Sequence, residues 1–194
     1  MEKENYADAS PTIVFIFTML CMMFWAQFAG ICQAETTLFL GLIQLGCWPA
    51  YLIGSNIVLS RGDTVSGNIY LIFATCFGGI GGLVNLFIYL SGIFGWPADH
   101  SIVGFVWIWA GAATLSAAIC VRKSPWVGFM VFLLAVFQLE IMGFVTLGIL
   151  TASIWTVIAK WLCLVIGIGG FYTMISGLLS FGGVHLPQGK PIFK

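Results

Sequence analysis

The sequence predicts an all-α integral membrane protein, a bundle of six transmembrane helices. Hydrophobic residues make up 60% of the 194 residues and charged residues only 7%, whereas soluble domains carry about 25% charged residues. The mean hydropathy is +1.06. Six apolar runs reach the roughly 17–25 residues that a membrane helix needs. We therefore expect a single membrane domain over residues 1–194, located in the cell membrane.

The six runs follow one another with short polar gaps, so neighbouring helices are expected to run antiparallel. The first and the fifth follow Ser10-Pro11 and Ser124-Pro125, and a capping residue before proline is typical of a helix start. Pro49 lies inside the second run, where we expect it to kink the helix. The predicted spans are about 12–31, 37–59, 66–93, 101–121, 126–148 and 154–181.

The basic residues outside the spans predict the orientation of the chain. The first, third and fifth loops hold no Lys or Arg, and cytoplasmic loops are the ones enriched in these residues. Both termini are therefore expected to be cytoplasmic. The basic residues fall in the N-terminal tail, the second and fourth loops and the C-terminal tail, as Lys3, Arg61, Arg122, Lys123, Lys190 and Lys194.

Several function classes are excluded by what the sequence contains. Seven basic and seven acidic residues cancel, which excludes the basic footprint of a nucleic-acid-binding protein. Six scattered cysteines without a C-x-x-C pair, and two isolated histidines, predict no metal and no cofactor. No nucleophile has a nearby base and no glycine-rich loop follows a strand, so we expect no enzyme. A transporter, a channel or a membrane scaffold remains.

Two charged residues fall inside the spans, Glu140 in the fifth and Lys160 in the sixth. An ionisable residue in the membrane is a functional-site hypothesis by default. Each lies about ten residues from the intervening loop, and therefore roughly 15 Å below it at 1.5 Å per residue. We predict that they pair. The pair is either a structural lock between two helices or an anion or proton site with Lys160 as the cation.

Uncharged polar residues are also scattered through the spans. They either line a polar path or form hydrogen bonds between helices, and the residues alone leave both interpretations open. Gly78 and Gly82 form a small-xxx-small pair, which predicts close packing of two helix backbones. The polar residues in question are Gln27, Gln44, Asn56, Asn85, Thr114, Gln138 and Tyr172.

Residues toward the C-terminus resemble those of a known family. They are Phe137 and Gly143, the stretch from Gly167 to Tyr172, and the closing Leu186-Pro187-Gln188-Gly189. With them, the chain resembles the acetate uptake transporter family, whose best-known bacterial members are succinate–acetate permeases.

The resemblance also has departures. The N-terminal signature of the family, Asn-Pro-Ala-Pro, reads here Asp8-Ala9-Ser10-Pro11 and keeps only the second proline. Glu140 stands where the family has an apolar residue, and Lys160 where it has a small one. These changes bear on the identity of the substrate more than on the fold.

The resemblance implies a homohexamer of six-helix protomers with a solute path through each protomer. It also implies an apolar constriction of Phe, Tyr and Leu. Leu matches Leu133, and Tyr matches Phe77, or Phe73 if the third helix is aligned without a gap. Phe falls near Ile102, beside Phe105. We expect Lys160, Glu140, Gln27 and Tyr172 to line the path or form an anion site.

The expected function is that of a channel or proton-coupled permease for acetate and related small monocarboxylates, with succinate as a further candidate. Its partners would be the solute, the lipid bilayer and further copies of the chain. One alternative is a channel for neutral solutes such as urea or short amides, which would be indifferent to loss of Lys160. Another is a membrane scaffold that transports nothing.

Overall fold

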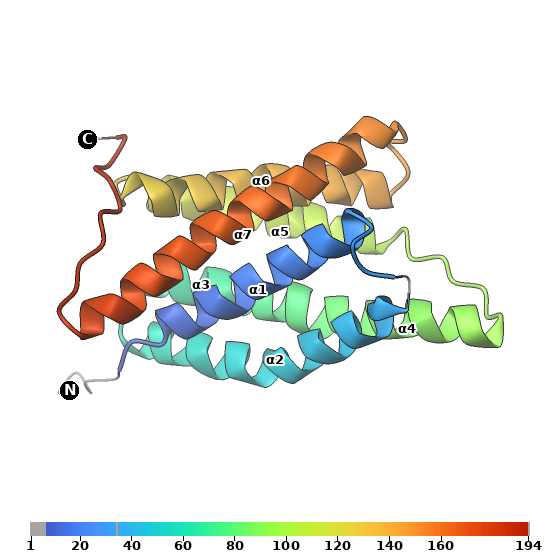
Figure 1. Ribbon diagram of the computed structural model, residues 1–194, viewed down its shortest axis with the longest axis horizontal. Helices are drawn as coiled ribbons and strands as arrows, with labels where there is room; N and C mark the ends of the chain where they lie inside the picture. Colours follow the sequence, from blue (N-terminus) through green and yellow to red (C-terminus); the bar gives the residue numbers. More distant parts are fainter. Residues whose placement is uncertain (1–6, 34, 194) are drawn as a thin grey trace.

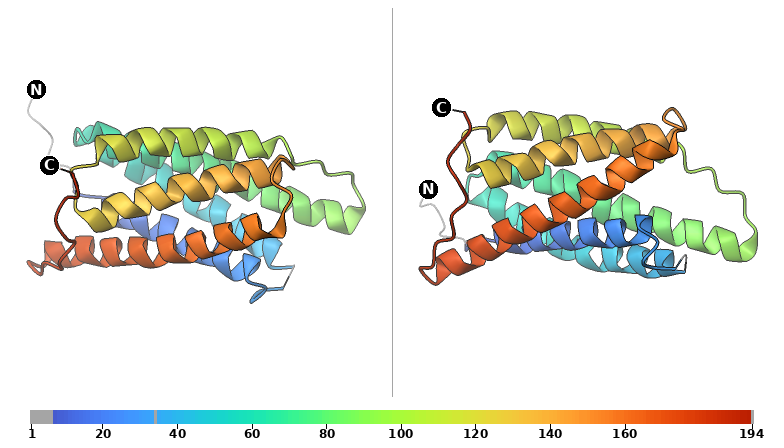
Figure 2. Two further views of the ribbon diagram at one scale, coloured as in Figure 1. Left: turned by 90° about the horizontal axis from the view of Figure 1, so that it is seen from above. Right: turned by 45° about the horizontal axis from the view of Figure 1, so that its top comes forward.

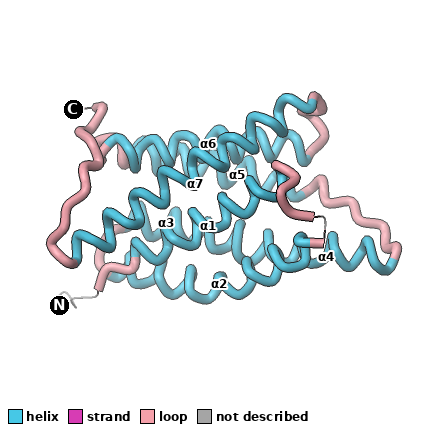
Figure 3. Tube along the Cα trace, viewed as in Figure 1, coloured by secondary structure: helices cyan, strands magenta, loops and turns pink. Residues whose placement is uncertain are grey.

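A computed structural model describes residues 7–33 and 35–193 of the chain. Its ordered elements are all helices (Figures 1 and 3). The elements α3, η1 and α4 form one continuous span, Thr64–Phe94, and with it six helices among the described residues are long and apolar enough to cross a membrane. The six predicted spans are thereby confirmed. The helices are α1 (Ser10–Phe28), α2 (Thr36–Ser60), α3 (Thr64–Phe73), η1 (Ala74–Ile80), α4 (Gly81–Phe94), α5 (Val103–Cys120), α6 (Trp126–Thr146) and α7 (Ser153–Phe181).

The predicted boundaries lie within three residues of the observed ones. The largest difference is at the end of α1, which stops at Phe28 rather than at residue 31. The chain turns there through Gly30 at φ 70°, a left-handed conformation that glycine adopts without strain. The apolar run continues past the turn, so composition alone places the helix end too late.

The helices lie side by side with their axes roughly along one direction (Figures 1 and 2). The most extensive contacts join α1 to α7, α5 to α6, and α6 to α7, while α2 packs against α3 and α4. The described chain begins and ends at the same end of the bundle (Figure 1), as an even number of spans requires. Lys3 and Lys194, used above to predict the orientation, lie outside the described residues.

Glycines let α2 approach the third span closely. A Cβ atom added at Gly41 would lie 2.9 Å from the Gly82 carbonyl oxygen, and one added at Gly82 would lie 3.0 Å from the Gly41 carbonyl oxygen. At Gly78, the Trp48 side chain occupies the corresponding space at 3.0 Å. The close packing predicted from Gly78 and Gly82 is confirmed, and its partner is α2. This helix also carries Pro49 and bows outward in its middle (Figure 1).

The third span is a π-helix in its central part, from Ala74 to Ile80. A π-helix closes each turn with an i→i+5 hydrogen bond, and such turns frequently occur at functional sites. The sequence pattern did not predict this irregularity. It falls where the third span meets the buried core, directly after Phe73, and it contains Phe77.

Candidate functional site

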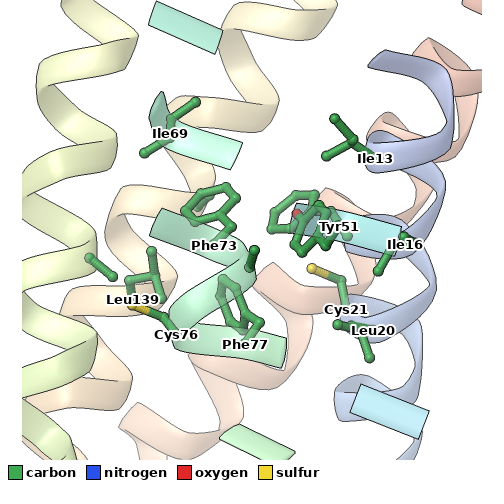
Figure 4. Close-up of a cluster of buried hydrophobic side chains, with 14 of the residues drawn as sticks. Ile13, Ile16, Leu20, Cys21, Tyr51, Ile69, Phe73, Cys76, Phe77 and Leu139 are labelled. Carbon is green, nitrogen blue, oxygen red and sulfur yellow. The ribbon is translucent and has the colours of Figure 1, made fainter. Parts of the chain in front are cut away.

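An aromatic cluster lies about midway along the spans. We call Phe17 of α1, Phe73 of α3 and Phe77 of η1 the aromatic constriction. Their ring centroids are 5.2 Å apart for Phe17 and Phe73, 5.4 Å for Phe73 and Phe77, and 6.1 Å for Phe17 and Phe77. All three side chains are buried. Figure 4 shows Phe73 and Phe77 one above the other, with Leu139 of α6 to one side.

Further side chains complete the wall of the constriction. The Trp107 ring of α5 stacks on Phe77 at a centroid distance of 5.5 Å. Phe24 of α1 approaches Phe77 from another side at 6.5 Å. Leu139 is almost completely buried and belongs to the same core. Helices α1, α5 and α6 thus surround the π-helical segment with apolar groups.

A cavity of about 210 Å³ opens at the end of the bundle that holds both termini. We call it the near cavity. Its deep part reaches Phe17 and Phe73, and its rim includes the loop between α5 and α6. The lining residues are Val14, Phe17, Ser66, Tyr70, Phe73, Val121, Ser124, Pro125, Gly128, Val131, Phe132, Ala135, Thr173 and Gln188.

A second cavity, of about 350 Å³, opens at the opposite end of the bundle. We call it the far cavity. Its deep part reaches Phe77, Trp107 and Leu139, and its outer part includes His100 from the loop before α5. The lining residues are Cys21, Phe24, Gln27, Phe28, Thr37, Phe77, Gly81, Val84, Asn85, Ile88, His100, Val103, Trp107, Gln138, Leu139, Met142, Thr146 and Cys163.

The two cavities meet the aromatic constriction from opposite sides. Phe17 and Phe73 form part of the near wall, and Phe77 forms part of the far wall. Both cavities have room for several water molecules or a small solute. Two hollows separated by one layer of aromatic rings are the arrangement expected of a narrow apolar gate, which blocks hydrated solutes by dewetting.

Gln44 of α2 holds the π-helical segment in place. Its side chain is fully buried and donates from Nε2 to the Phe77 carbonyl oxygen at 2.6 Å. Its Oε1 accepts from Asn85 Nδ2, also at 2.6 Å. Because a buried carbonyl without a partner is costly, this contact stabilises the irregular turn that carries Phe77. Asn85 in turn lines the far cavity, so a chain of hydrogen bonds joins that cavity to the backbone of the constriction.

Most of the scattered polar residues named here fit one of the two interpretations left open above, and Thr114 fits neither. Gln27, Asn85 and Gln138 line the far cavity, and Gln27 donates to the Thr37 hydroxyl at 2.9 Å. Gln44 forms hydrogen bonds between helices. Thr114 donates to the Ala110 carbonyl of its own helix at 2.6 Å.

The structure does not bring the three predicted constriction residues together. Phe77 lies in the aromatic constriction. Ile102 precedes α5 and is 73% exposed, because the chain has not yet entered the bundle at that point. Leu133 is half-buried and lines neither cavity, since α6 turns Phe132 and Ala135 toward the near cavity instead.

The predicted ion pair between Glu140 and Lys160 is wrong within this chain. Both residues were predicted to lie at the same depth in the membrane, but their side chains do not face each other. The Glu140 carboxylate lies against Gly111 of α5, and Lys160 Nζ lies 5.7 Å from the centre of its neighbour's ring, Trp161. Neither residue lines the near or the far cavity.

Of the remaining predicted residues, Tyr172 lies outside both cavities and donates from its hydroxyl to the Pro187 carbonyl oxygen at 2.7 Å. Asp8, Ala9, Ser10 and Pro11 anchor the start of α1: Ala9 packs against the core and Pro11 is buried.

Asp8 accepts from the Ser10 backbone N–H at 2.9 Å and pairs with Arg61 at 2.6 Å. Partial burial works to raise the pKa of Asp8, but the hydrogen bonds from Ser10 and the Arg61 guanidinium outweigh it and hold this pKa below its usual value.

The described lining residues of both cavities include no Lys, Arg, Asp or Glu. Polar groups on the walls are hydroxyls and amides, together with the imidazole of His100, the indole N–H of Trp107 and the thiols of Cys21 and Cys163. Over residues 7–33 and 35–193, no three His, Cys, Asp or Glu side chains gather in a way that could hold a metal ion. The chemistry that this arrangement supports is hydrogen bonding to a small solute.

Comparison with known proteins finds no matching family model and no matching curated protein. Among solved structures, the chain is similar to the bacterial acetate channel SatP, with a TM-score of 0.73 and 17% sequence identity. The alignment covers 93% of this chain and 98% of that chain. The two chains share one fold. The likeness confirms, at the level of fold, the resemblance read from the sequence, and this chain is a multi-pass membrane protein.

Proposed function

We propose that this protein is a channel or proton-coupled permease for acetate and related small monocarboxylates. The observation that carries the proposal is the pair of cavities that meet at Phe17, Phe73 and Phe77. A fold shared with a bacterial acetate channel supports it. Succinate, which carries two carboxylates, is a further candidate solute with a higher cost of desolvation.

The uncharged walls favour a particular form of the solute at the constriction. A small carboxylic acid titrates near the range of Asp and Glu, at about 4, so it is almost entirely anionic at neutral pH. Amide and hydroxyl donors can replace water around the anion in each cavity. A charge among apolar rings is far more costly, so the solute passes Phe77 as the neutral acid. Because protonation increases as the pH falls, flux should rise with acidity.

The test is uptake of labelled acetate by liposomes that contain the purified protein. We expect saturable uptake that other small acids compete with and that increases when the outside is made more acidic than the inside. Empty liposomes exposed to the same gradient measure the background of acid that crosses the lipid alone. Uptake equal to that background, with the protein intact, would overturn the proposal.

A channel for neutral solutes is the second candidate, and the absence of charged side chains among the described lining residues favours it. The same liposomes distinguish the two functions. Saturable flux of urea or acetamide without saturable acetate flux would identify a neutral-solute channel. No flux of any of these solutes, together with a co-purifying partner, would instead identify a membrane scaffold.

We further propose that the chain forms one domain in the cell membrane, with both termini cytoplasmic and six copies per assembly. Arg61, Arg122 and Lys190 lie in segments at one end of the bundle, as the positive-inside rule requires of a cytoplasmic face. The resemblance to the acetate uptake transporter family supports the hexamer. Native mass spectrometry measures the copy number, and protease protection of a C-terminal tag measures the orientation.

A further inference from the structure

The segment after α7 turns back across the end of the bundle. It starts beyond Phe181 and runs toward the beginning of α6, as Figures 1 and 3 show. We call residues 182–193 the C-terminal segment. The Val127 backbone N–H donates to the Gln188 carbonyl oxygen at 3.4 Å, and the Phe193 ring meets Phe129 edge-on at a centroid distance of 5.6 Å.

Three more contacts fix the middle of the C-terminal segment. The Tyr172 hydroxyl donates to the Pro187 carbonyl oxygen at 2.7 Å, and Gln188 Nε2 donates to the Ser176 hydroxyl, also at 2.7 Å. Gly189 lies so close to the Trp126 indole that a Cβ atom there would overlap the ring, and its φ of +78° excludes most other residues as well. The contacts hold Leu186-Pro187-Gln188-Gly189 in one position between α6 and α7.

This position makes Gln188 part of the wall of the near cavity. Of the lining residues that the structure describes there, Gln188 is the one that carries an amide side chain. Another polar group of the wall, the Thr173 hydroxyl, already donates to the Gly170 carbonyl at 2.8 Å. An amide NH₂ group has two hydrogens. The Ser176 hydroxyl accepts one of those of Gln188, which leaves the second for another acceptor.

We propose that Gln188 binds the solute in the near cavity by donating this second N–H to the carboxylate. The inference rests on the proposed transport of small carboxylates and adds a binding residue to it. In the absence of a lining Lys or Arg among the described residues, a neutral donor with fixed direction is the means of holding an anion without trapping it. The C-terminal segment is then a wall of the binding chamber rather than a tail.

The far cavity also has amide side chains that a hydrogen bond to a neighbouring residue orients. Gln27 is oriented by its hydrogen bond to Thr37, and Asn85 by its bond to Gln44. In each case one amide hydrogen is used for positioning and one remains. A solute that enters either cavity thus meets an amide held by the protein. Gln188 differs in that it comes from outside the helices.

The experiment measures the concentration dependence of acetate uptake for four variants in liposomes. Gln188→Leu removes the donor at similar size and should raise the half-saturating acetate concentration about tenfold, because the carboxylate loses a hydrogen bond that Gln188 donates in the near cavity. Maximal flux should stay close to that of the unmodified protein. Gln188→Glu should raise this concentration further, because a second carboxylate repels the solute.

Tyr172→Phe removes one anchor but leaves the amide, so it should raise the half-saturating concentration less than Gln188→Leu does. Lys190→Ala, in the same segment and exposed, is the matched control and should leave uptake unchanged.

The outcomes separate this inference from the proposed function. An unmodified protein that transports acetate, together with a Gln188→Leu variant of unchanged half-saturating concentration, overturns the role of Gln188 alone. A variant that loses maximal flux with no change in that concentration assigns Gln188 a structural role and also overturns the inference. Absence of saturable uptake by the unmodified protein overturns both.

Discussion

The near and far cavities are built in different ways. Helices supply nearly all of the far wall, and hydrogen bonds between helices orient its amides Gln27 and Asn85. The near cavity is closed in part by connections, namely the α5–α6 loop and the C-terminal segment with Gln188. Segments with exposed backbone open locally at a lower cost than packed helices do. We therefore expect the far side to be the more rigid half of the proposed pathway and the near side, although its contacts hold Gln188 in place, to be the more adjustable half.

The largest expected effect is at Phe77, where the two cavities meet. Phe77→Ala should lower the free energy of unfolding by about 3–5 kcal/mol, the usual cost of removing a buried aromatic side chain. It should also join the near and far cavities, so that uptake discriminates less between acetate and a bulkier acid such as butyrate. Thermal unfolding in detergent and paired uptake assays measure the two effects.

Phe171→Ala is the matched control for this change. Phe171 lies on α7, is 50% exposed and lines neither cavity. Its variant should keep both the stability and the solute preference of the unmodified protein. If Phe77→Ala is destabilised but still prefers acetate to the same degree, the aromatic constriction does not select the solute.

The next largest effect is a loss of stability expected for the hydrogen-bond network beside the far cavity. Gln44→Leu leaves the Phe77 carbonyl without its partner and releases Asn85. The free energy of unfolding should therefore fall by about 2 kcal/mol, which is within the range for buried groups that lose a partner. Adding Asn85→Leu should cost little more, because the two residues share one network. A double-mutant cycle of unfolding free energies measures this coupling. Independent, additive losses would show that the network does not act as a unit.

The sequence predicts the six spans well because length and hydropathy determine them, and the predicted boundaries differ from the observed ones mainly where a glycine ends a helix early. It predicts the site less well. Phe77 was found through the family resemblance, but Phe17, Trp107 and the π-helix were missed, since one buried aromatic among many carries no periodic signal. Gln44 and Asn85 were noted as polar, yet their pairing depends on how α2 and α4 pack.

A smaller effect is expected at the near end, where Asp8 pairs with Arg61. Both side chains are about one-third exposed, and exposed pairs contribute about 0–1 kcal/mol. The pKa of Asp8 is lower in the folded protein than its usual value. The contribution of Asp8 to the stability of the fold is therefore complete at a pH above its usual pKa, near 3.8. This contribution is lost as the pH falls through the folded-state pKa.

Asp8→Asn should accordingly be slightly less stable than the unmodified protein at pH 7, and the difference should shrink as the pH is lowered below about 4. Melting temperatures of both proteins between neutral and acidic pH measure it. Arg61→Gln should show the same trend, because it removes the other half of the pair. A difference between Asp8→Asn and the unmodified protein that stays constant with pH would argue against an electrostatic contribution of Asp8.

The smallest effect on uptake is expected for Lys160→Ala, because Lys160 lines neither the near nor the far cavity. An anion site at Lys160 is one of the two interpretations that the sequence leaves open, but the structure places its Nζ beside the Trp161 ring and outside both cavity walls. A charge that does not face the solute acts on it only over a distance, and such attraction weakens as the distance grows. We therefore expect the half-saturating acetate concentration to remain that of the unmodified protein. A several-fold increase at unchanged maximal flux would mean that Lys160 attracts the anion before it enters a cavity, and that neutral donors alone do not hold it.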